Sequence, residues 1–466
     1  MNRAANVAAL DDEDRWDFII VGGGATGLGV AIDAASRGYR TLLLEQGDFA
    51  HGTSSRSTKL VHGGVRYLQQ GNVSLVIEAL RERGLLRANA PHLVHNLSFV
   101  VPNYEWWEGP FYGVGLKMYD LLAGRQGFGR SKVLSRERTL QLLPTLEPEG
   151  LNGGVIYYDG QFDDARLAVN MAQTAAGQGA VVLNYVRVTG LIKDDGVVAG
   201  VRARELESGA EHALRARAVI NATGAWTDGL RQMDDPSAGA IIRPSQGVHL
   251  MLPRDFLPGE SAIMVPKTDD GRVLFAIPWL DRVVVGTTDT PVDEALLEPV
   301  PFEEEVAFLL EHAGRYLSKD PGPEDVLSVF AGIRPLVGSE DAADTSSLSR
   351  DHTLLISDSG LVTIAGGKWT TYRMMAEDTV DQAAILADLE ERPCVTHDLH
   401  IHGHHSRAER FGELAAYGSD APRIRALIKE DDDLAGSLAP AFTYRAAEVV
   451  WAARHEMART VEDVLT

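Results

Sequence analysis

Residues 17–45 read DFIIVGGGATGLGVAIDAASRGYRTLLLE. The apolar run at 17–21 meets a glycine cluster and then an alanine-rich segment, which together predict a strand, a tight turn and a helix. Gly22, Gly24 and Gly27 keep the G-x-G-x-x-G spacing. The absent side chains let the turn close, let the backbone approach a pyrophosphate and let the helix pack on the strand. The phosphates are expected at the helix N-terminus, whose N–H groups and dipole favour negative charge.

A second strand and an acidic residue complete this pattern. Gly38 ends the helical segment, residues 41–44 predict a strand, and Glu45 stands at its end. An acid about 20 residues beyond such a turn reaches a ribose hydroxyl. The order of strand, glycine turn, helix, second strand and acidic residue predicts an adenine dinucleotide ligand, and both NAD and FAD are compatible with it. The alternative, a glycine-rich turn without a ligand, does not account for the acid in register.

Length and composition indicate a globular chain of two or three domains, because 466 residues exceed the usual size of one. No apolar stretch reaches the roughly 18 residues that a membrane span needs. Residues 1–15 are polar and acidic and lack the pattern of a signal peptide, so we expect a disordered lead-in and a cytoplasmic protein. Cys394 is the single cysteine, which excludes an intrachain disulfide and argues against a cysteinyl-flavin bond.

The net charge of −22 argues against nucleic acid and against electrostatic binding to anionic lipid. An acidic protein that binds a phosphorylated substrate must gather cations locally. The glycine-rich segments contain five such cations: Lys59, Arg66, Arg334, Arg350 and Lys368. The alternative is that each is a solvated surface charge, the commoner situation of Lys and Arg.

Five further segments carry a family resemblance. They are GTSSRSTKLVHGGVRYL at 52–68, YYDGQFDDARL at 157–167, GIRPL at 332–336, SRDH at 349–352 and GGKWTTYR at 366–373. In this order they closely resemble the signature segments of the FAD-dependent glycerol-3-phosphate dehydrogenases, of the D-amino-acid-oxidase-like flavoprotein superfamily. The resemblance runs from about Asp17 to the last residue.

The resemblance and the strand and helix patterns imply an α/β fold of three domains. A two-dinucleotide-binding (Rossmann-like) FAD domain is expected from residues 14–90, 153–240 and 330–390. An antiparallel-sheet substrate-binding or cap domain is expected from 91–152 and 241–329. Residues 394–466 form a C-terminal helical domain, whose final helix the resemblance implies to be truncated.

The cofactor that the resemblance implies is FAD, bound non-covalently. A helix opened by Gly366 and Gly367 would direct its positive end at the pyrimidine edge of the flavin. The residues expected to bind FAD are Gly22, Gly24, Ala25, Thr26, Gly27, Glu45, Thr53, Ser54, Ser55, Lys59, His62, Gly63, Gly64, Val186, Ala222, Thr223, Gly224, Gly332, Gly367, Lys368, Trp369 and Thr370.

The activity that the resemblance implies is oxidation of sn-glycerol 3-phosphate to dihydroxyacetone phosphate by hydride transfer to FAD, with electrons passed on to a quinone. Such a reaction requires a base for the hydroxyl proton and cations for the substrate. The expected catalytic residues are Arg334, Lys368 and the candidate bases His62 and His249, and the expected substrate-binding residues are Arg66, Tyr67 and Arg350.

Three alternatives stay open. The first is an oxidase that passes electrons to oxygen and releases hydrogen peroxide. The second is oxidation of an amine or a 2-hydroxy acid on the same fold, against which the concentration of cations favours phosphate. The third is a non-catalytic flavin-binding protein, which would lack the cations.

Two other stretches allow two interpretations each. The aromatic residues between 104 and 122 suit either a membrane-interface helix, giving peripheral contact with the inner membrane, or a packed helix of the substrate domain. The scarcity of cations there favours the packed helix. His397, His400, His402, His404 and His405 suit a metal site or a polar linker, and the absence of a fixed ligand spacing favours the linker, with no metal predicted. A homodimer is left open.

Overall fold

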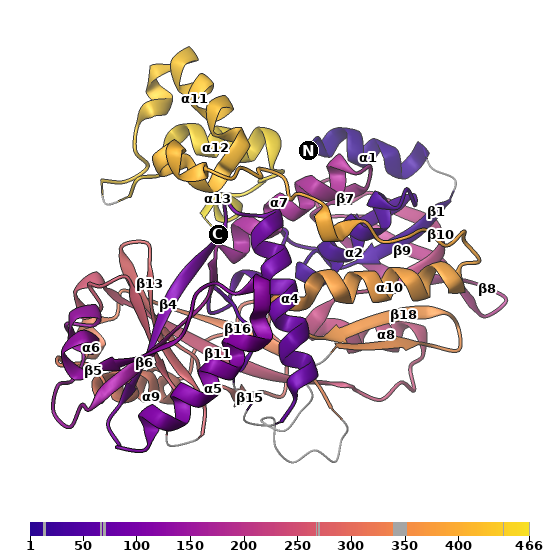
Figure 1. Cartoon of the computed structure of the whole chain (residues 1–466). Helices are drawn as coiled ribbons and strands as arrows, with labels where there is room; N and C mark the ends of the chain where they lie inside the picture. The colour runs from indigo at the N-terminus through magenta and orange to yellow at the C-terminus, as the bar shows by residue number, and fades with distance from the viewer. Residues whose placement is uncertain are drawn as a thin grey trace.

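The computed structural model describes residues 1–12, 15–65, 68, 71–266, 268, 271–338, 352–440 and 442–465 (Figure 1). Two large sheets organise this part of the chain, with a helical C-terminal region above them. The predicted mixed α/β fold is confirmed.

The first sheet contains the glycine-rich turn. Its main path runs β17-β18-β10-β1-β2-β7, and β1, β2, β7, β10 and β18 pair in parallel. The central strands are apolar and buried, as expected where helices cover both faces of a parallel sheet. The strands are β1 (Trp16–Val21), β2 (Thr41–Leu44), β7 (Val181–Leu183), β8 (Val186–Asp194), β9 (Val197–Glu205), β10 (Glu211–Asn221), β17 (His352–Ile356) and β18 (Leu361–Gly366).

Three helices pack together beside this sheet: α2 (Ala25–Ser36), α7 (Asp164–Gly177) and α10 (Tyr372–Leu386). The backbone of α2 approaches α10 closely, because a Cβ added at Gly29 would lie 2.8 Å from the Tyr372 ring. An antiparallel meander adjoins this sheet, in which β8 pairs with β9 and β9 pairs with the first half of β10. The second half of β10 then enters the parallel sheet beside β1.

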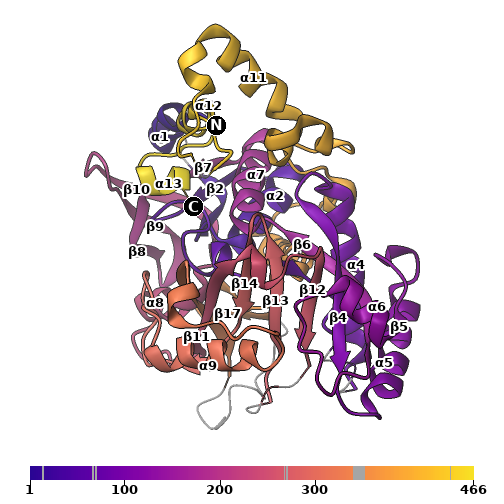
Figure 2. The same ribbon diagram turned by 90° about the vertical axis from the view of Figure 1, so that its left-hand side faces the viewer.

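The second sheet has ten strands and is mainly antiparallel, as the short β-rich segments predict. Figure 2 shows β12, β13 and β14 side by side, with α9 (Glu303–Gly314) near β11. The strands are β3 (Leu60–Val61), β4 (Val94–Asn103), β5 (Lys132–Ser135), β6 (Gly153–Phe162), β11 (Ile242–Pro253), β12 (Ser261–Val265), β13 (Leu274–Trp279), β14 (Arg282–Gly286), β15 (Thr290–Pro291) and β16 (Ser328–Val337). Helices α4 (Val73–Asn89), α5 (Glu108–Ala123) and α6 (Arg136–Leu142) lie beside it.

Sheet membership differs from the expected domain limits at three strands. β3, β6 and β16 come from residues expected in the FAD domain, yet all three belong to the second sheet, where β3 pairs with β6. β6 pairs along its length with β4, and β16 pairs with β11 from Val337 to Ser328. The chain therefore crosses between the two sheets more often than composition indicates.

The N-terminal segment differs from the prediction. Residues 1–15 were expected to be disordered, but α1 (Arg3–Asp12) is a helix beside β7. Leu10 is buried, Arg3 forms an ion pair with Glu205 at 2.6 Å, and the Met1 amine donates to the His455 carbonyl at 2.8 Å. These long-range contacts stabilise a segment whose polar sequence carries no sign of them.

The predicted C-terminal helical region is present, with α11 (Ala421–Glu430), α12 (Ala446–His455) and α13 (Val461–Leu465). It has a small core of its own around Ile424 and Trp451. It is joined to α7 by the paired contacts of Arg166 with Glu456. Among the described helices none combines the length and apolarity needed to cross a membrane.

Candidate active site

A cavity of about 590 Å³ lies where the two sheets meet. The parallel strands β1, β2, β10 and β18 direct their carboxyl ends toward it, and the residues that follow these strands line it: Gly22, Glu45, Ala222 and Gly367. Ligands of open parallel sheets bind at this edge. The antiparallel sheet contributes the opposite wall through β11 and β16.

The glycine-rich turn forms one end of the cavity. Gly22 has a φ of 111°, and a Cβ added there would lie 2.5 Å from the Ala222 carbonyl oxygen. A Cβ at Gly27 would lie only 1.9 Å from the Gly22 carbonyl oxygen, so α2 can pack on β1 only with glycine there. The Ala25 N–H at the start of α2 donates to Ser54 Oγ at 3.0 Å.

Glu45 lies beside this turn at the end of β2. Its carboxylate accepts the backbone N–H of Gly23 and of Gly47, both at 2.7 Å. Burial raises the pKa of Glu45 although these donors favour the charged form. The side chain still borders the cavity, at the position where a ribose hydroxyl is expected.

Two predicted cations, Arg334 and Lys368, also border the cavity. The Arg334 guanidinium on β16 donates to Thr287 Oγ1 at 2.8 Å and lies 3.5 Å from Asp289 Oδ1. It rests against the backbone of Gly247, where an added Cβ would meet Arg334 Nη2 at 2.4 Å. Lys368 enters the cavity after Gly366 and Gly367, whose φ angles are 74° and 73°.

Both candidate bases border the cavity. His249 Nε2 lies 2.9 Å from Thr58 Oγ1, and the ring stacks on Phe330 at 4.8 Å. Burial, followed by the charges of Arg334 and Lys59, lowers the pKa of His249 well below its usual range. His62 borders the cavity from the segment after β3, and its backbone N–H donates to Thr370 Oγ1 at 3.2 Å.

The structure brings most of the predicted site residues together. Those that line the cavity are Gly22, Gly24, Ala25, Thr26, Glu45, Thr53, Ser54, His62, Val186, Ala222, Thr223, Gly224, His249, Gly332, Arg334, Gly367, Lys368, Trp369 and Thr370. The predicted substrate-binding residues Arg66, Tyr67 and Arg350 lie outside the described residues.

Five predicted cofactor residues support the cavity without lining it: Gly27, Ser55, Lys59, Gly63 and Gly64. Lys59 Nζ forms an ion pair with Asp164 at 2.5 Å and donates to the Ser55 carbonyl at 2.7 Å. An added Cβ at Gly63 would meet Leu80 at 2.5 Å. Lys59 is therefore a structural cation in this arrangement, in contrast to the expectation that it faces a ligand.

The structure also adds residues that sequence reasoning missed. Arg56, Thr58, Trp226, Gly247 and Leu297 all line the cavity. Arg56 and Thr58 lie within the 52–68 segment, and Gly247 is two residues from His249 on the same face of β11. No sequence motif indicated Leu297, which lies in the segment between β15 and α9.

The residues present fit a bound dinucleotide. The turn at Gly22 leaves no room for a side chain, and the N-terminus of α2 faces the cavity beside Ser54. The hydroxyl-bearing residues Thr53 and Ser54 also line the cavity. Adjoining residues thus offer backbone and hydroxyl donors for phosphates, and Glu45 offers an acceptor for ribose.

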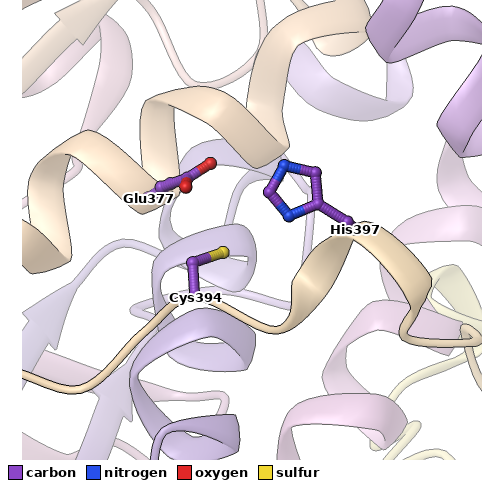
Figure 3. Close-up of side chains that lie close together, drawn as sticks. All are labelled: Glu377, Cys394 and His397. Carbon is purple, nitrogen blue, oxygen red and sulfur yellow. The ribbon is translucent and has the colours of Figure 1, made fainter.

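A second group of ligand-like side chains lies outside the cavity. Glu377, Cys394 and His397 bring one potential ligand atom each within 4.8 Å of the others (Figure 3). The Arg373 guanidinium already donates to Glu377 at 2.7 Å, and the Cys394 thiol donates to Asp33 at 3.0 Å. Burial and that bond to Asp33 raise the pKa of Cys394 to about 11. We interpret the group as a hydrogen-bonded cluster that joins α2 and α10.

The other histidines of the histidine-rich segment make contacts of their own. His402 pairs with Asp420 at 2.6 Å, and the rings of His400 and His404 stack at 3.6 Å. His405 accepts the backbone N–H of Arg407. These four side chains thus have separate contacts, whereas His397 lies in the group with Glu377 and Cys394. The polar linker without a metal stays a prediction.

Comparison with known proteins defines the class. The sequence model of the FAD-dependent oxidoreductases matches residues 17–373, and that of the C-terminal domain of alpha-glycerophosphate oxidase matches residues 362–466. Fold and cavity therefore define a flavin-dependent oxidoreductase.

Individual relatives narrow this class. Mitochondrial glycerol-3-phosphate dehydrogenase of Mus musculus is 46% identical over 417 residues, covering 86% of this chain and 57% of that protein. The chain thus spans a little over half of that relative. Glycerol-3-phosphate dehydrogenase SDP6 of Arabidopsis thaliana is 42% identical over 511 residues, covering 100% of this chain and 81% of that protein.

A solved structure agrees with these relatives. The glycerol-3-phosphate dehydrogenase from Bacillus halodurans, solved with FAD, has a TM-score of 0.76 and 32% identity over 99% of this chain and 87% of that one. The chain belongs to the family of FAD-dependent glycerol-3-phosphate dehydrogenases. FAD is its cofactor.

Proposed function

We propose that the protein oxidises sn-glycerol 3-phosphate to dihydroxyacetone phosphate. The observation that carries the proposal is that two cations, Arg334 and Lys368, line the dinucleotide cavity of a chain whose net charge is −22. A guanidinium offers a planar fork of donors that suits phosphate and alkoxide oxygens. The name shared by the relatives supports the same substrate.

In this proposal, the turn at Gly22, the start of α2 and Glu45 hold the adenosine and phosphate portions of FAD. When bound, FAD supplies the acceptor for the substrate hydride. Arg334 orients the reacting hydroxyl and stabilises the negative charge that grows on its oxygen. Lys368 and the start of the helix that follows stabilise negative charge on the flavin or phosphate. Arg66, Tyr67 and Arg350 stay predicted phosphate contacts.

We propose that His62 accepts the proton of the substrate hydroxyl. Both histidines border the cavity, but burial and two neighbouring cations make His249 a weak proton acceptor. His249 instead holds Thr58 and packs against Phe330. Accordingly, His62→Gln is expected to remove the acidic limb from the pH profile of kcat/KM, while His249→Gln retains it.

We further propose a quinone in a membrane as the electron acceptor, reached by peripheral contact at the cytoplasmic face. Helix α5 buries Gly113, Leu116 and Tyr119 and exposes an opposite apolar face. This exposed stripe consists of Trp107, Phe111, Val114, Met118 and Leu121, with Trp106 just before it. It supports the membrane-interface interpretation and the packed-helix interpretation together, one on each face. A homodimer stays a prediction.

Anaerobic mixing of the FAD-loaded protein with glycerol 3-phosphate tests the activity. We expect the flavin absorbance near the visible maximum to bleach, and Arg334→Ala to abolish bleaching while FAD stays bound. Bleaching by amines or 2-hydroxy acids alone would contradict the proposed substrate. Admitting air or a quinone analogue afterwards identifies the acceptor. Recovery with air alone would favour the oxidase, for which the match of residues 362–466 to an oxidase domain provides some support.

A further inference from the structure

The segment between β15 and α9 crosses the rim of the cofactor cavity. We call residues 292–300 the strap. Its first end is fixed by the β15 pairing with β11 and by the Val292 N–H, which donates to the Pro244 carbonyl at 3.1 Å. Its second end is fixed by Gln246, whose amide donates to the Val300 carbonyl at 3.0 Å. Between these ends, Leu297 lines the cavity.

Side chains of the FAD-binding wall hold the middle of the strap. The Trp226 indole N–H donates to the Ala295 carbonyl at 3.0 Å, and Arg56 Nη1 donates to the Leu297 carbonyl at 2.8 Å. Both Trp226 and Arg56 also line the cavity. The cofactor wall and the strap are thus joined by side chains that border the cofactor space itself.

Glu298 adds charged contacts between the strap and the cofactor wall. Arg56 Nη2 donates to both carboxylate oxygens of Glu298 at 2.8 Å, and His51 Nε2 lies 2.8 Å from one of them. The Arg56 side chain is 16% exposed, whereas that of Glu298 is 70% exposed. The carboxylate therefore reaches from solvent onto two side chains that belong to the segment between β2 and β3.

Among the described residues, few apolar contacts add to these polar contacts of the strap. Leu296, Leu297 and Val300 are 48%, 41% and 69% exposed, so the strap buries a small apolar area. A segment with few apolar contacts opens at low free energy. Its closed state then depends on the Glu298 contacts and on the carbonyls bonded to Arg56 and Trp226.

We propose that the strap retains FAD and that Glu298 is the clamp that keeps it closed. In this proposal the strap covers the exit of the cofactor, so the dissociation rate of FAD follows the fraction of time that the strap is open. This proposal concerns cofactor retention alone and is independent of the substrate and of the electron acceptor.

The experiment compares two charge-removing variants of the FAD-loaded protein. Glu298→Gln removes the clamp. Glu294→Gln removes an equal charge from the same strap, at an exposed side chain that makes no hydrogen bond or ion pair with a described residue. FAD release is followed as the rise in flavin fluorescence after dilution, with thermal unfolding as a check that both variants fold.

We expect Glu298→Gln to release FAD about three- to tenfold faster than the wild type, the range for a few exposed charge contacts, and Glu294→Gln to match the wild type. About 0.5 M NaCl should accelerate the wild type and affect Glu298→Gln much less, because salt screens exposed ion pairs. Glu298→Lys, which repels Arg56, should release FAD fastest. Equal release rates for Glu298→Gln and Glu294→Gln, whether fast or slow, would overturn the proposal.

Discussion

At the scale of single residues, the position of Arg334 at the cavity depends on the missing side chain of Gly247 as well as on the groups that bind the guanidinium. Arg334 is held by Thr287 and Asp289 on one side and lies against the bare backbone of Gly247 on the other. Any side chain at 247 would occupy the place of the guanidinium. Gly247 is therefore expected to position Arg334 without touching the substrate.

The variant Gly247→Ala tests this packing. Its Cβ would lie 2.4 Å from Arg334 Nη2, so the guanidinium must move. Displacement of an orienting group by about 1 Å costs on the order of 10²-fold in rate, so we expect kcat/KM to fall by about that factor with FAD content unchanged. Gly115→Ala, whose Cβ would meet nothing within 4 Å, is the matched control. Wild-type kinetics for Gly247→Ala would contradict this role.

At the scale of elements, two helices far apart in sequence are joined by a buried ion pair. Arg373 on α10 donates two hydrogen bonds to Glu82 on α4, both at 2.7 Å, and both side chains are buried. Helix α10 follows directly after the Lys368 segment, and α4 follows the segment that contains His62. The ion pair thus fixes two elements that place cavity residues.

Removal of one partner from this pair should be costly. Glu82→Gln leaves the buried Arg373 charge without its main counterion, and we expect a loss of about 3 kcal/mol in the free energy of unfolding. Chemical denaturation of the FAD-loaded protein measures the change. Arg81→Gln, at an exposed position of the same helix, should leave stability within about 0.5 kcal/mol of the wild type. Equal stability of both variants would contradict the structural importance of the pair.

Helix α5 carries the prediction for the membrane. Because the whole chain has a charge of −22, attachment through the exposed apolar stripe should rest on apolar contact and resist high salt. Leu121 is 80% exposed, so Leu121→Glu should abolish flotation with neutral phosphatidylcholine vesicles without loss of fold. Ile385→Glu, at a 59% exposed apolar residue of α10, should float like the wild type. Flotation of Leu121→Glu would rule this stripe out as the contact surface.

At the scale of the whole molecule, the C-terminal region is docked by polar contacts of buried groups. His92 lies in this junction, with Nε2 2.9 Å from the Asn170 amide of α7 and beside Gly403. Burial, followed by the nearby Arg166 charge, lowers the pKa of His92 to about 3. The folded protein therefore keeps His92 neutral well below the pH at which an unfolded chain protonates it.

This difference predicts a pH dependence of stability. The unfolded chain binds the proton near pH 6.5, so the contribution of His92 is complete above that pH and is lost as the pH falls toward about 3. The loss approaches about 1.4 kcal/mol per pH unit. His92→Gln should flatten the decline between about pH 6 and pH 4.5, measured by denaturation at each pH. Parallel wild-type and variant curves would contradict the assignment.

Much of the local structure could be predicted from short-range pattern. The alanine-rich segment after the glycine turn was predicted as a helix and is α2, and residues 41–44 were predicted as a strand and are β2. Apolar periodicity and turn residues suffice there because neighbours in sequence decide the backbone. The same reasoning predicted disorder at 1–15, where the helix α1 depends on Glu205 and His455, which no local pattern indicates.

By itself, the sequence determined that a dinucleotide turn follows the first strand of the sheet and which family the glycine-rich segments resemble, because spacing and residue type dictate local turns and anion contacts. Only the tertiary structure decided which cations face the cavity. Lys59 and Arg334 are both cations in glycine-rich segments, so the sequence does not distinguish them. In the structure Lys59 is paired with Asp164, whereas Arg334 lies against Gly247 at the cavity. The contacts of the strap with Arg56, Trp226 and His51 are likewise visible only in the tertiary structure. The physical reason is that exposure and charge pairing are set by residues hundreds of positions apart, which meet only when the two sheets pack.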